Sequence, residues 1–485
     1  MDFTRKTFLG GAVAAMTAGC ARNEASSSAK SRYYSTLPVL GEFDVVVLGA
    51  GPGGIGAALA AARRGCKVAL VEKYGFAGGV GAYGCTPIFF LFEHRGPKGW
   101  GAPPSEWRQI IKGIPDEVVR RLDKIGAVVP MKDGRSQDPL LGERIGEKPL
   151  LGKVMFSVEH LKATYEEMLS EAGVARIFYA HICDAVCEGR RIDGAVVSCI
   201  EGLRMVKGKV FVDATGEASF AALAGNAVEK AAPGETMHKS AFVFIGGLKP
   251  GAIENYDRMY LNLRADGKIP AKTWASSGYS RLLHEGEAIL PVAIATGDST
   301  SSADMARMDA ELRRTNLMLL EALRREVPGF ENAHIITESM QVGSRDGRHM
   351  VARTKIDIDF LAYGEVPKDG VVPIWRWWGG EHAADQSKGF GGTGARGYDG
   401  RLTFVPYRAL VARDFDNLLA AGRGIWCDSY TVTTVRMMPT CMAIGEAAGT
   451  AAAKAVADGI NDLGDVRILP QGGNKKTSNR SGKLS

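Results

Sequence analysis

The fold of this chain is decided by FDVVVLGAGPGG, residues 43–54, and by the segments that follow it. Residues 43–48 form a β-branched apolar run, which is typical of a buried parallel strand. Residues 55–64 are small and apolar and predict a helix, and residues 66–71 predict a second strand. A G-x-G-x-x-G turn between a strand and a helix is the fingerprint of a dinucleotide-binding fold. The sequence therefore predicts an α/β protein that binds a dinucleotide.

The glycines of this turn have separate physical reasons to be there. Gly49 permits the sharp turn, Gly51 lets the backbone approach a pyrophosphate, and Gly54 allows the helix to pack closely on the strand. Gly53 lies in the same turn, ahead of a helix whose N-terminal N–H groups and positive dipole end favour phosphate. Glu72 lies 23 residues after Gly49, where a carboxylate can bind ribose hydroxyls. This motif alone does not distinguish FAD from NAD.

Three further segments combine a predicted strand with small residues that let the backbone approach a ligand. The first follows Glu72, the second follows a strand over residues 209–212, and the third follows a strand over residues 417–420. The residues of these segments that we expect to contact the cofactor are Lys73, Gly78, Gly79, Ala214, Thr215, Gly216, Gly422, Arg423, Met438, Pro439 and Thr440.

Taken together, these segments resemble the bacterial FAD-dependent oxidoreductase family of the glutathione-reductase-like flavoprotein superfamily, over about residues 41–460. The most specific match is RMMPTCMAIG, residues 436–445. Glu217 departs from the pattern, because an aspartate often follows the Ala-Thr-Gly turn, and residues 375–396 depart from it as well. The resemblance implies bound FAD. It also implies a helix that begins near Pro439 and points its N-terminus at the flavin pyrimidine edge, where its dipole would stabilise a negative charge.

The resemblance further implies how the chain is divided. The fold class is α/β, with a discontinuous Rossmann-like FAD-binding domain of the glutathione reductase type and an inserted α+β substrate domain. The expected divisions are a signal peptide and tether at 1–32, FAD-binding segments at 41–95, 156–228 and 403–462, an insertion or lid at 96–155, a substrate domain at 229–402 and a disordered tail at 463–485.

Residues 49–54 hold the one complete dinucleotide fingerprint of the sequence. Residues 246–247 and 389–397 are rich in glycine but lack the frame of strand, turn and helix. We therefore do not expect NAD(P)H to bind in a second domain of this chain. Electrons should instead be exchanged between FAD and an external partner, such as a quinone, a small redox protein or oxygen.

Four side chains are candidates for substrate chemistry: Arg345, Arg348, His238 and His382. The two arginines are three residues apart, so they can clamp a carboxylate, a sugar hydroxyl or a flavin phosphate, or can equally form structural ion pairs. A histidine near flavin can accept a hydroxyl proton as hydride leaves the carbon. A lone histidine is, however, more often a structural or surface group.

Aromatic and sulfur-containing side chains leave further alternatives open. Trp375, Trp377 and Trp378 cluster beside turn glycines, where they can stack on a sugar ring or form ordinary core. Tyr83 and Cys85 follow the glycine pair and can carry a covalent flavin link or simply pack. The eight cysteines are scattered, so we predict neither a disulfide framework nor a metal site.

The N-terminus predicts export. TRKTFL, residues 4–9, leads into an apolar run that ends at residue 19 and is too short to span a bilayer. This order resembles a twin-arginine signal with Lys6 in place of the second arginine. Cys20 resembles the lipidated cysteine of a lipoprotein, which would be the protein's only attachment to a membrane. We expect a periplasmic protein, and the alternative is a cytoplasmic protein with a short amphipathic or disordered N-terminus.

The charge distribution bears on partners. The net charge of +6 arises at the two ends, and residues 33–465 carry a net charge of −2. No basic stripe with interleaved aromatic residues occurs, so we expect no nucleic-acid partner.

The leading hypothesis is an FAD-dependent dehydrogenase that oxidises a C–OH group of a small polar, carbohydrate-like substrate. Three alternatives remain: a flavin-dependent reductase of an activated C=C bond, a non-enzymatic flavin-binding lipoprotein or electron-relay protein, and an NAD enzyme with a single Rossmann fold.

Overall fold

We describe the protein from a computed structural model, which places residues 34, 36–90, 92–96, 103–130, 145–146, 149–231, 236–274, 280–281, 284–379 and 396–470. The signal segment with Cys20, His382 and the tail from residue 471 lie outside these described residues. In the described part of the chain, no helix is long and apolar enough to cross a membrane.

The main sheet has a parallel centre, as the sequence predicts. Its strands run in the order β8 (Ala175–Ile177), β2 (Val68–Val71), β1 (Val39–Leu48) and β11 (Gly202–Asp213), and β20 (Leu418–Ala420) pairs with the end of β11. Val45 of β1 lies beside Val68 of β2 and Val210 of β11, in parallel register on both sides. The last four residues of β1 are fully buried, which explains why this strand reads as a continuous apolar run.

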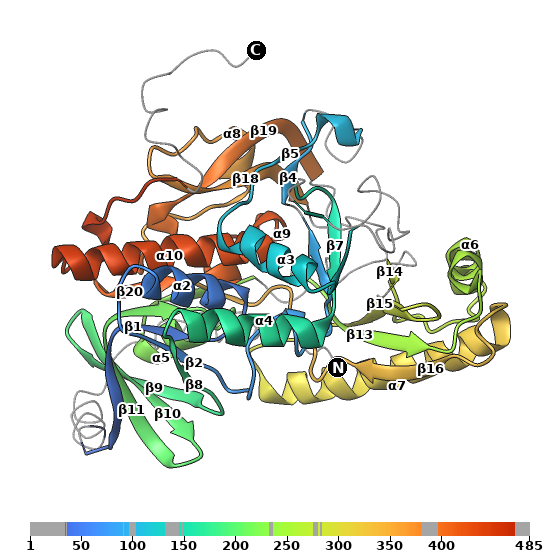
Figure 1. Cartoon of the computed structure of the whole chain (residues 1–485), viewed down its shortest axis with the longest axis horizontal. Helices are drawn as coiled ribbons and strands as arrows, with labels where there is room; N and C mark the ends of the chain where they lie inside the picture. Colours follow the sequence, from blue (N-terminus) through green and yellow to red (C-terminus); the bar gives the residue numbers. More distant parts are fainter. Residues whose placement is uncertain are drawn as a thin grey trace, which may run out of the picture.

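An antiparallel extension completes this sheet. β9 (His181–Glu188) and β10 (Arg191–Cys199) form a meander that pairs with the first half of β11. Figure 1 shows this meander projecting from the same sheet as β1 and β11. The observed fold is therefore a mixed α/β fold with a parallel, Rossmann-like core.

Two helices from opposite ends of the chain, α2 (Pro52–Ala62) and α10 (Met438–Asp458), lie alongside each other at this sheet (Figure 1). A Cβ added at Gly445 would lie 1.9 Å from the carbonyl oxygen of Gly53, and one at Gly449 would lie 2.1 Å from that of Ala57. These distances leave no room for a side chain, so the glycines allow backbone to touch backbone. This close approach explains why the sequence of α10 is rich in Ala and Gly.

The segment predicted as an insertion or lid contributes to the main core. Helix α3 (Ile114–Lys124) buries Val118 and Leu122 in the core cluster that also contains β1, and its Ile114 N–H donates to the Glu446 carboxylate of α10 at 2.9 Å. Around it lie β4 (Glu93–His94) paired with β5 (Arg108–Gln109), the antiparallel sheet β3 (Ile88–Phe90), β7 (Lys153–Phe156) and β6 (Val128–Pro130), and helix α4 (Val158–Glu171).

A second sheet lies within residues 229–402. Its antiparallel strands run in the order β14 (Ser280–Arg281), β15 (Ala288–Ala295), β13 (Lys239–Gly246) and β16 (His334–Glu338). Helices α6 (Ala252–Ala265) and α7 (Ser302–Glu326) pack on it and form a separate core around Tyr256, Leu319 and Phe330. Figure 1 shows this unit extending away from the main sheet.

The remaining helices and strands lie outside these two sheets. These are α5 (Ser219–Ala224), β12 (Val228–Lys230) paired with β17 (Arg348–Met350), α8 (Ile358–Tyr363), α9 (Val432–Val435), and the hairpin of β18 (Gly370–Gly379) and β19 (Arg396–Pro406).

Candidate functional site

A cavity of about 1210 Å³ lies at the carboxyl ends of β1, β2, β11 and β20. Its wall begins with Gly49 after β1, Glu72 after β2, Ala214 after β11 and Ala421 after β20. It continues to Ser240 and Phe242 on β13 of the second sheet. Ligands of open α/β sheets bind at this end of the strands. The volume exceeds the roughly 300–1,000 Å³ of a site for one drug-sized molecule, so the cavity is large enough for a ligand of dinucleotide size.

The glycine turn is shaped to receive a pyrophosphate. Gly49 has φ +103°, and a Cβ there would lie 2.6 Å from the carbonyl oxygen of Ala214. A Cβ at Gly54 would lie 1.8 Å from the carbonyl oxygen of Gly49, so the helix packs on the turn itself. At Gly51 the nearest atom to a Cβ is 3.8 Å away, which leaves its outer side open to the cavity. Helix α2 begins without a side-chain cap, so its first N–H groups can receive phosphate oxygens.

Glu72 occupies the position expected of the ribose-binding carboxylate. It lines the cavity and is only 9% exposed. Burial raises the pKa of its carboxyl group, while the N–H groups of Ala50 at 2.7 Å and Tyr74 at 3.2 Å favour the ionised form. The Ala50 bond ties the end of β2 to the glycine turn, so the carboxylate is held beside the phosphate-binding backbone.

Most of the predicted cofactor residues meet at this cavity. Those that line it are Gly49, Gly51, Gly53, Glu72, Lys73, Gly79, Ala214, Thr215, Gly216, Gly422, Arg423 and Met438. Four others, Gly54, Gly78, Pro439 and Thr440, lie behind the wall. Gly78 has φ +128° and donates its N–H to the carbonyl of Ala50 at 2.8 Å, so it shapes the wall from behind.

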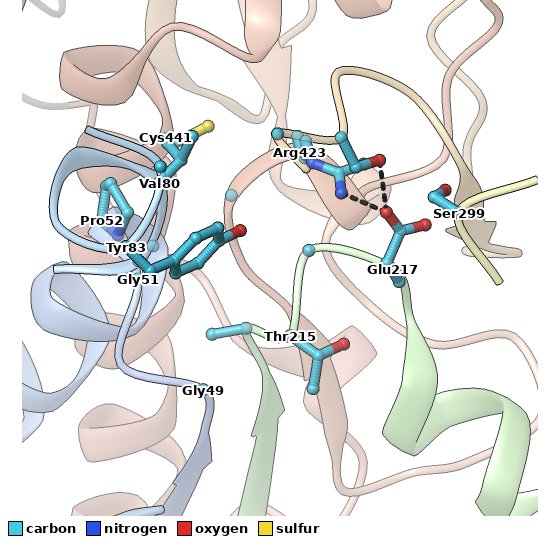
Figure 2. A pocket seen from close by; sticks show the side chains of 18 of the residues that line it. Gly49, Gly51, Pro52, Val80, Tyr83, Thr215, Glu217, Ser299, Arg423 and Cys441 are labelled. Atoms are coloured by element: carbon cyan, nitrogen blue, oxygen red, sulfur yellow. Dashed lines mark hydrogen bonds and ion pairs between the residues drawn. The ribbon is translucent and has the colours of Figure 1, made fainter. Parts of the chain in front are cut away.

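Glu217 and Arg423 form an ion pair on the wall, which Figure 2 shows opposite Tyr83. Ser344 Oγ donates to the Glu217 carboxylate at 2.7 Å, and the Arg348 N–H donates to it at 3.2 Å. Burial alone would raise the pKa of Glu217, but the Arg423 charge and these hydrogen bonds hold it below its ordinary value. The sequence marked Glu217 only as a departure from the family pattern, and its role became visible when the fold brought Arg423 to it.

The two predicted arginines separate into different roles. Arg348 donates from Nε to the carbonyl oxygen of Glu217 at 3.1 Å and from Nη2 to Ser219 Oγ at 3.3 Å, which is the structural alternative for this residue. Both arginines line the cavity, but Arg345 has its guanidinium 5.0 Å from the Trp274 ring centroid. Burial and the charge of Arg436 lower the pKa of Arg345 to about 9, so it still carries its charge at neutral pH.

Of the two predicted histidines, only His238 belongs to the described residues, and it does not line the cavity. His238 is fully buried and packs edge-on against Trp274 at 5.6 Å between ring centroids, and its carbonyl oxygen accepts from Arg345 Nη1 at 3.4 Å. Trp274 and Ser240 line the cavity, whereas His238 lies behind them. A role for His238 as a base that touches substrate is therefore not supported by its position.

Of the two residues proposed for a covalent flavin link, Tyr83 and Cys85, only Tyr83 lines the main cavity. Tyr83 lines the cavity, but Cys85 lines a second, smaller cavity of about 280 Å³ and donates its thiol to the Glu338 carbonyl at 3.5 Å. This placement favours packing for Cys85. Trp375 is buried and donates its indole N–H to the carbonyl of Glu93 at 2.5 Å, while the side chains of Trp377 and Trp378 lie outside the description. Within the described ranges, no group of three His, Cys, Asp or Glu side chains could hold a metal ion.

Lys153 is a cavity residue that sequence reasoning missed. It lies on β7 and lines the wall, and burial together with the charge of Arg95 lowers its pKa. In the part of the chain that is described, no carboxylate forms an ion pair with it. No local motif marks this lysine, because its place on the wall depends on the pairing of β7 with β3.

Comparison with known proteins identifies the family. Residues 44–469 match the family model for FAD-dependent oxidoreductases. The chain is 46% identical over 66 residues to dihydrolipoyl dehydrogenase of Chlorobaculum parvum, which covers 14% of each protein. It is 37% identical over 90 residues to glutathione reductase of Burkholderia cepacia, which covers 16% of this chain and 20% of that one. These matches span a fifth or less of the curated relatives.

Solved structures give a broader likeness. Anhydrotetracycline hydroxylase OxyS of Streptomyces rimosus superposes with a TM-score of 0.43 at 13% identity, over 86% of this chain and 63% of that one. A geranylgeranyl bacteriochlorophyll reductase-like protein of Thermoplasma acidophilum gives a TM-score of 0.40 at 14% identity, over 86% and 79%. The match of the family model to most of the chain, together with a glycine cradle that fits a dinucleotide, shows that the protein belongs to the FAD-dependent oxidoreductase family and binds FAD.

Proposed function

We propose that this protein is a dehydrogenase that oxidises a C–OH group of a small polar substrate and passes the electrons to an external acceptor. The observation that carries this proposal is the single cavity that joins the dinucleotide-binding turn to the second sheet. A ligand on the side of Phe242 and Trp274 would lie in the same space as the cofactor. Bound FAD supplies a hydride acceptor, which no amino-acid side chain can provide.

The chain supplies the proton acceptor that alcohol oxidation requires. Lys153 lines the cavity, and its lowered pKa increases the fraction of neutral amine near neutral pH. A neutral amine at Nζ can take the hydroxyl proton of a substrate in the cavity. Lys153 therefore takes the role that the sequence suggested for a histidine.

The FAD domain that we propose here is of the glutathione reductase type, and the N-terminus of α10 is placed as such a domain requires. Met437 and Met438 line the cavity, and α10 begins without a side-chain cap. Its N-terminal N–H groups and positive dipole end are therefore available to a negative charge in the cavity. The main sheet also takes strands from both ends of the chain, as a discontinuous domain of this type requires.

Reduction of an activated C=C bond is the second candidate, and Tyr83 favours it. Its phenol lines the cavity, and burial raises its pKa, so the group stays protonated. A protonated phenol can donate a proton to the carbon next to the one that receives hydride. Figure 2 shows the Tyr83 ring projecting into the site between the glycine turn and the Glu217–Arg423 pair.

The electron partner and the location follow from the sequence and belong to the same proposal. One dinucleotide fingerprint supports a quinone or a small redox protein as acceptor, and the N-terminal segment supports export by the twin-arginine route, with a lipid at Cys20. NAD(P)⁺ should not reoxidise the reduced protein, whereas an artificial quinone should.

Anaerobic reduction tests the proposal. The purified holoprotein is mixed without oxygen with a panel of sugars, cyclitols and hydroxy acids, and the visible absorbance of the flavin is followed. A dehydrogenase loses this absorbance with one of these compounds alone. A C=C reductase keeps it with every alcohol, loses it with dithionite, and regains it when an activated alkene is added.

A further inference from the structure

The cavity wall carries more positive charge than the cofactor can balance. Of the described residues that line it, beside the neutral amine proposed for Lys153, five are cationic and two are carboxylates: Lys73, Arg345, Arg348, Arg423 and Arg436 against Glu72 and Glu217. The diphosphate of a bound FAD carries two negative charges. An excess of one positive charge therefore remains in a partly desolvated space, where unbalanced charge is costly.

Within the described residues, Arg345 is an arginine of the wall that has no carboxylate partner. No carboxylate lies within ion-pair distance of its guanidinium in the described structure. The adjacent carboxylates are engaged elsewhere, because Glu217 pairs with Arg423 and Asp346 accepts from His349 Nε2 at 3.1 Å. Among the described residues, Arg345 contacts the carbonyl oxygen of His238 at 3.4 Å and the face of Trp274.

These contacts fix the guanidinium without neutralising it. The Trp274 face orients the plane, and the single carbonyl contact leaves the other N–H groups of the fork to a ligand. Arg436 lines the same cavity and adds a second positive charge close enough to act on Arg345. A planar fork matches a carboxylate, which it can bind through two parallel hydrogen bonds.

We infer that Arg345, with Arg436 beside it, binds a carboxylate of the substrate, so that the substrate is a small hydroxy acid rather than a neutral sugar. This inference rests on the proposed function, in which the substrate shares the cavity with FAD. It adds the substrate class and the group that selects it.

Binding of a simple carboxylate to the oxidised holoprotein tests the inference without turnover. Acetate, which has no C–OH group to oxidise, is titrated against the visible flavin spectrum, with acetamide as a neutral control of the same shape and inorganic phosphate as a second anion. We expect acetate to perturb the spectrum saturably and acetamide to do so at least tenfold more weakly. Equal binding of amide and acid would overturn the inference, as would binding of phosphate alone.

The Arg345→Met variant locates the site. Loss of a charge-assisted pair should weaken carboxylate binding roughly ten- to hundredfold, and Arg345→Lys should restore part of it. Arg313→Met is the matched control, because Arg313 lies half-exposed on α7 and pairs with Glu338. Unchanged carboxylate affinity in Arg345→Met would refute the site. A third outcome would assign Arg345 to the cofactor instead. In it, both Arg345 variants lose FAD, and the wild-type protein binds acetate and acetamide with equal affinity.

The two proposals fail in different ways. If carboxylates bind through Arg345 but no hydroxy acid reduces the flavin, the binding site stands and the dehydrogenase proposal falls. If a neutral sugar reduces the flavin equally well in wild type and Arg345→Met, the dehydrogenase stands and the carboxylate inference falls.

Discussion

At the scale of single residues, Lys153 is the most informative side chain on the cavity wall. If its neutral amine accepts the hydroxyl proton, Lys153→Met should slow flavin reduction by the alcohol about a hundredfold or more. The base is active when deprotonated, so the wild-type rate should rise with pH. Because the pKa is lowered from 10.5, that rise should level off below pH 10.5. Rapid-mixing measurements across a pH series provide the check.

A second lysine provides the control for this prediction. Lys162→Met removes a lysine that pairs with Glu159 on the surface of α4, away from the main cavity, and should leave the rate and the pH profile unchanged. An unchanged pH profile in Lys153→Met would mean that another group accepts the proton.

The Glu217–Arg423 pair makes a prediction about stability. Glu217→Gln leaves the charge of Arg423 without its partner, which should lower the free energy of unfolding by about 2–3 kcal/mol at pH 7. The folded pKa of Glu217 lies below the value of about 4.3 in an unfolded chain. The contribution of the pair is therefore present above that pH and is lost as the pH falls through the folded pKa.

Urea unfolding of the wild type and the variant at several pH values tests this account. The difference between them should shrink as the pH falls below about 4. Glu159→Gln breaks an exposed pair on α4 and should cost about 0.5 kcal/mol or less. A Glu217→Gln effect as small as that control would show that the pair adds little to stability.

At the scale of elements, the contact of α2 with α10 holds the phosphate-binding turn in place. Gly445→Ala would put a Cβ 1.9 Å from the Gly53 carbonyl oxygen, so the helices would have to separate. We expect a loss of about 1–3 kcal/mol in stability and weaker FAD binding, because Gly53 belongs to the turn. Thermal unfolding and FAD titration of the apoprotein measure both, with Thr450→Ala on the same helix as the control. Full FAD affinity in Gly445→Ala would contradict this coupling.

The elements also show what could be predicted from sequence. The strand, turn and helix at residues 43–64 are local, so hydrophobic pattern and glycine spacing were sufficient to predict β1, the turn and α2. The starting region of α10 was predicted from Pro439 for the same reason. The position of α3 was not predicted, because its contact with α10 joins residues 332 positions apart.

The candidate substrate site was less accessible to sequence reasoning. Glu217 and Arg423 are 206 positions apart, and no sequence feature near either residue predicts that they form an ion pair. Lys153 reaches the wall only because β7 pairs with β3. His238 attracted a catalytic role as a lone histidine before a strand, but the fold turns it behind Trp274. Side-chain direction across a cavity is set by tertiary packing, which no local pattern contains.

At the scale of the whole molecule, the two sheets contribute different parts of the cavity wall. The parallel sheet supplies the turns that hold FAD, and the antiparallel sheet supplies β13 and the Arg345 loop on the other part of the wall. Under our proposal, an alcohol is oxidised where these two parts meet, and the electrons leave to a partner outside the chain.

The most direct test of this account is a single anaerobic turnover with one alcohol, in its ordinary form and with deuterium on the carbinol carbon. We predict that each flavin is reduced with formation of one carbonyl product, and that deuterium slows the reduction. An oxidised flavin after exposure to every alcohol of the panel, or reduction without a carbonyl product, would contradict the central claim.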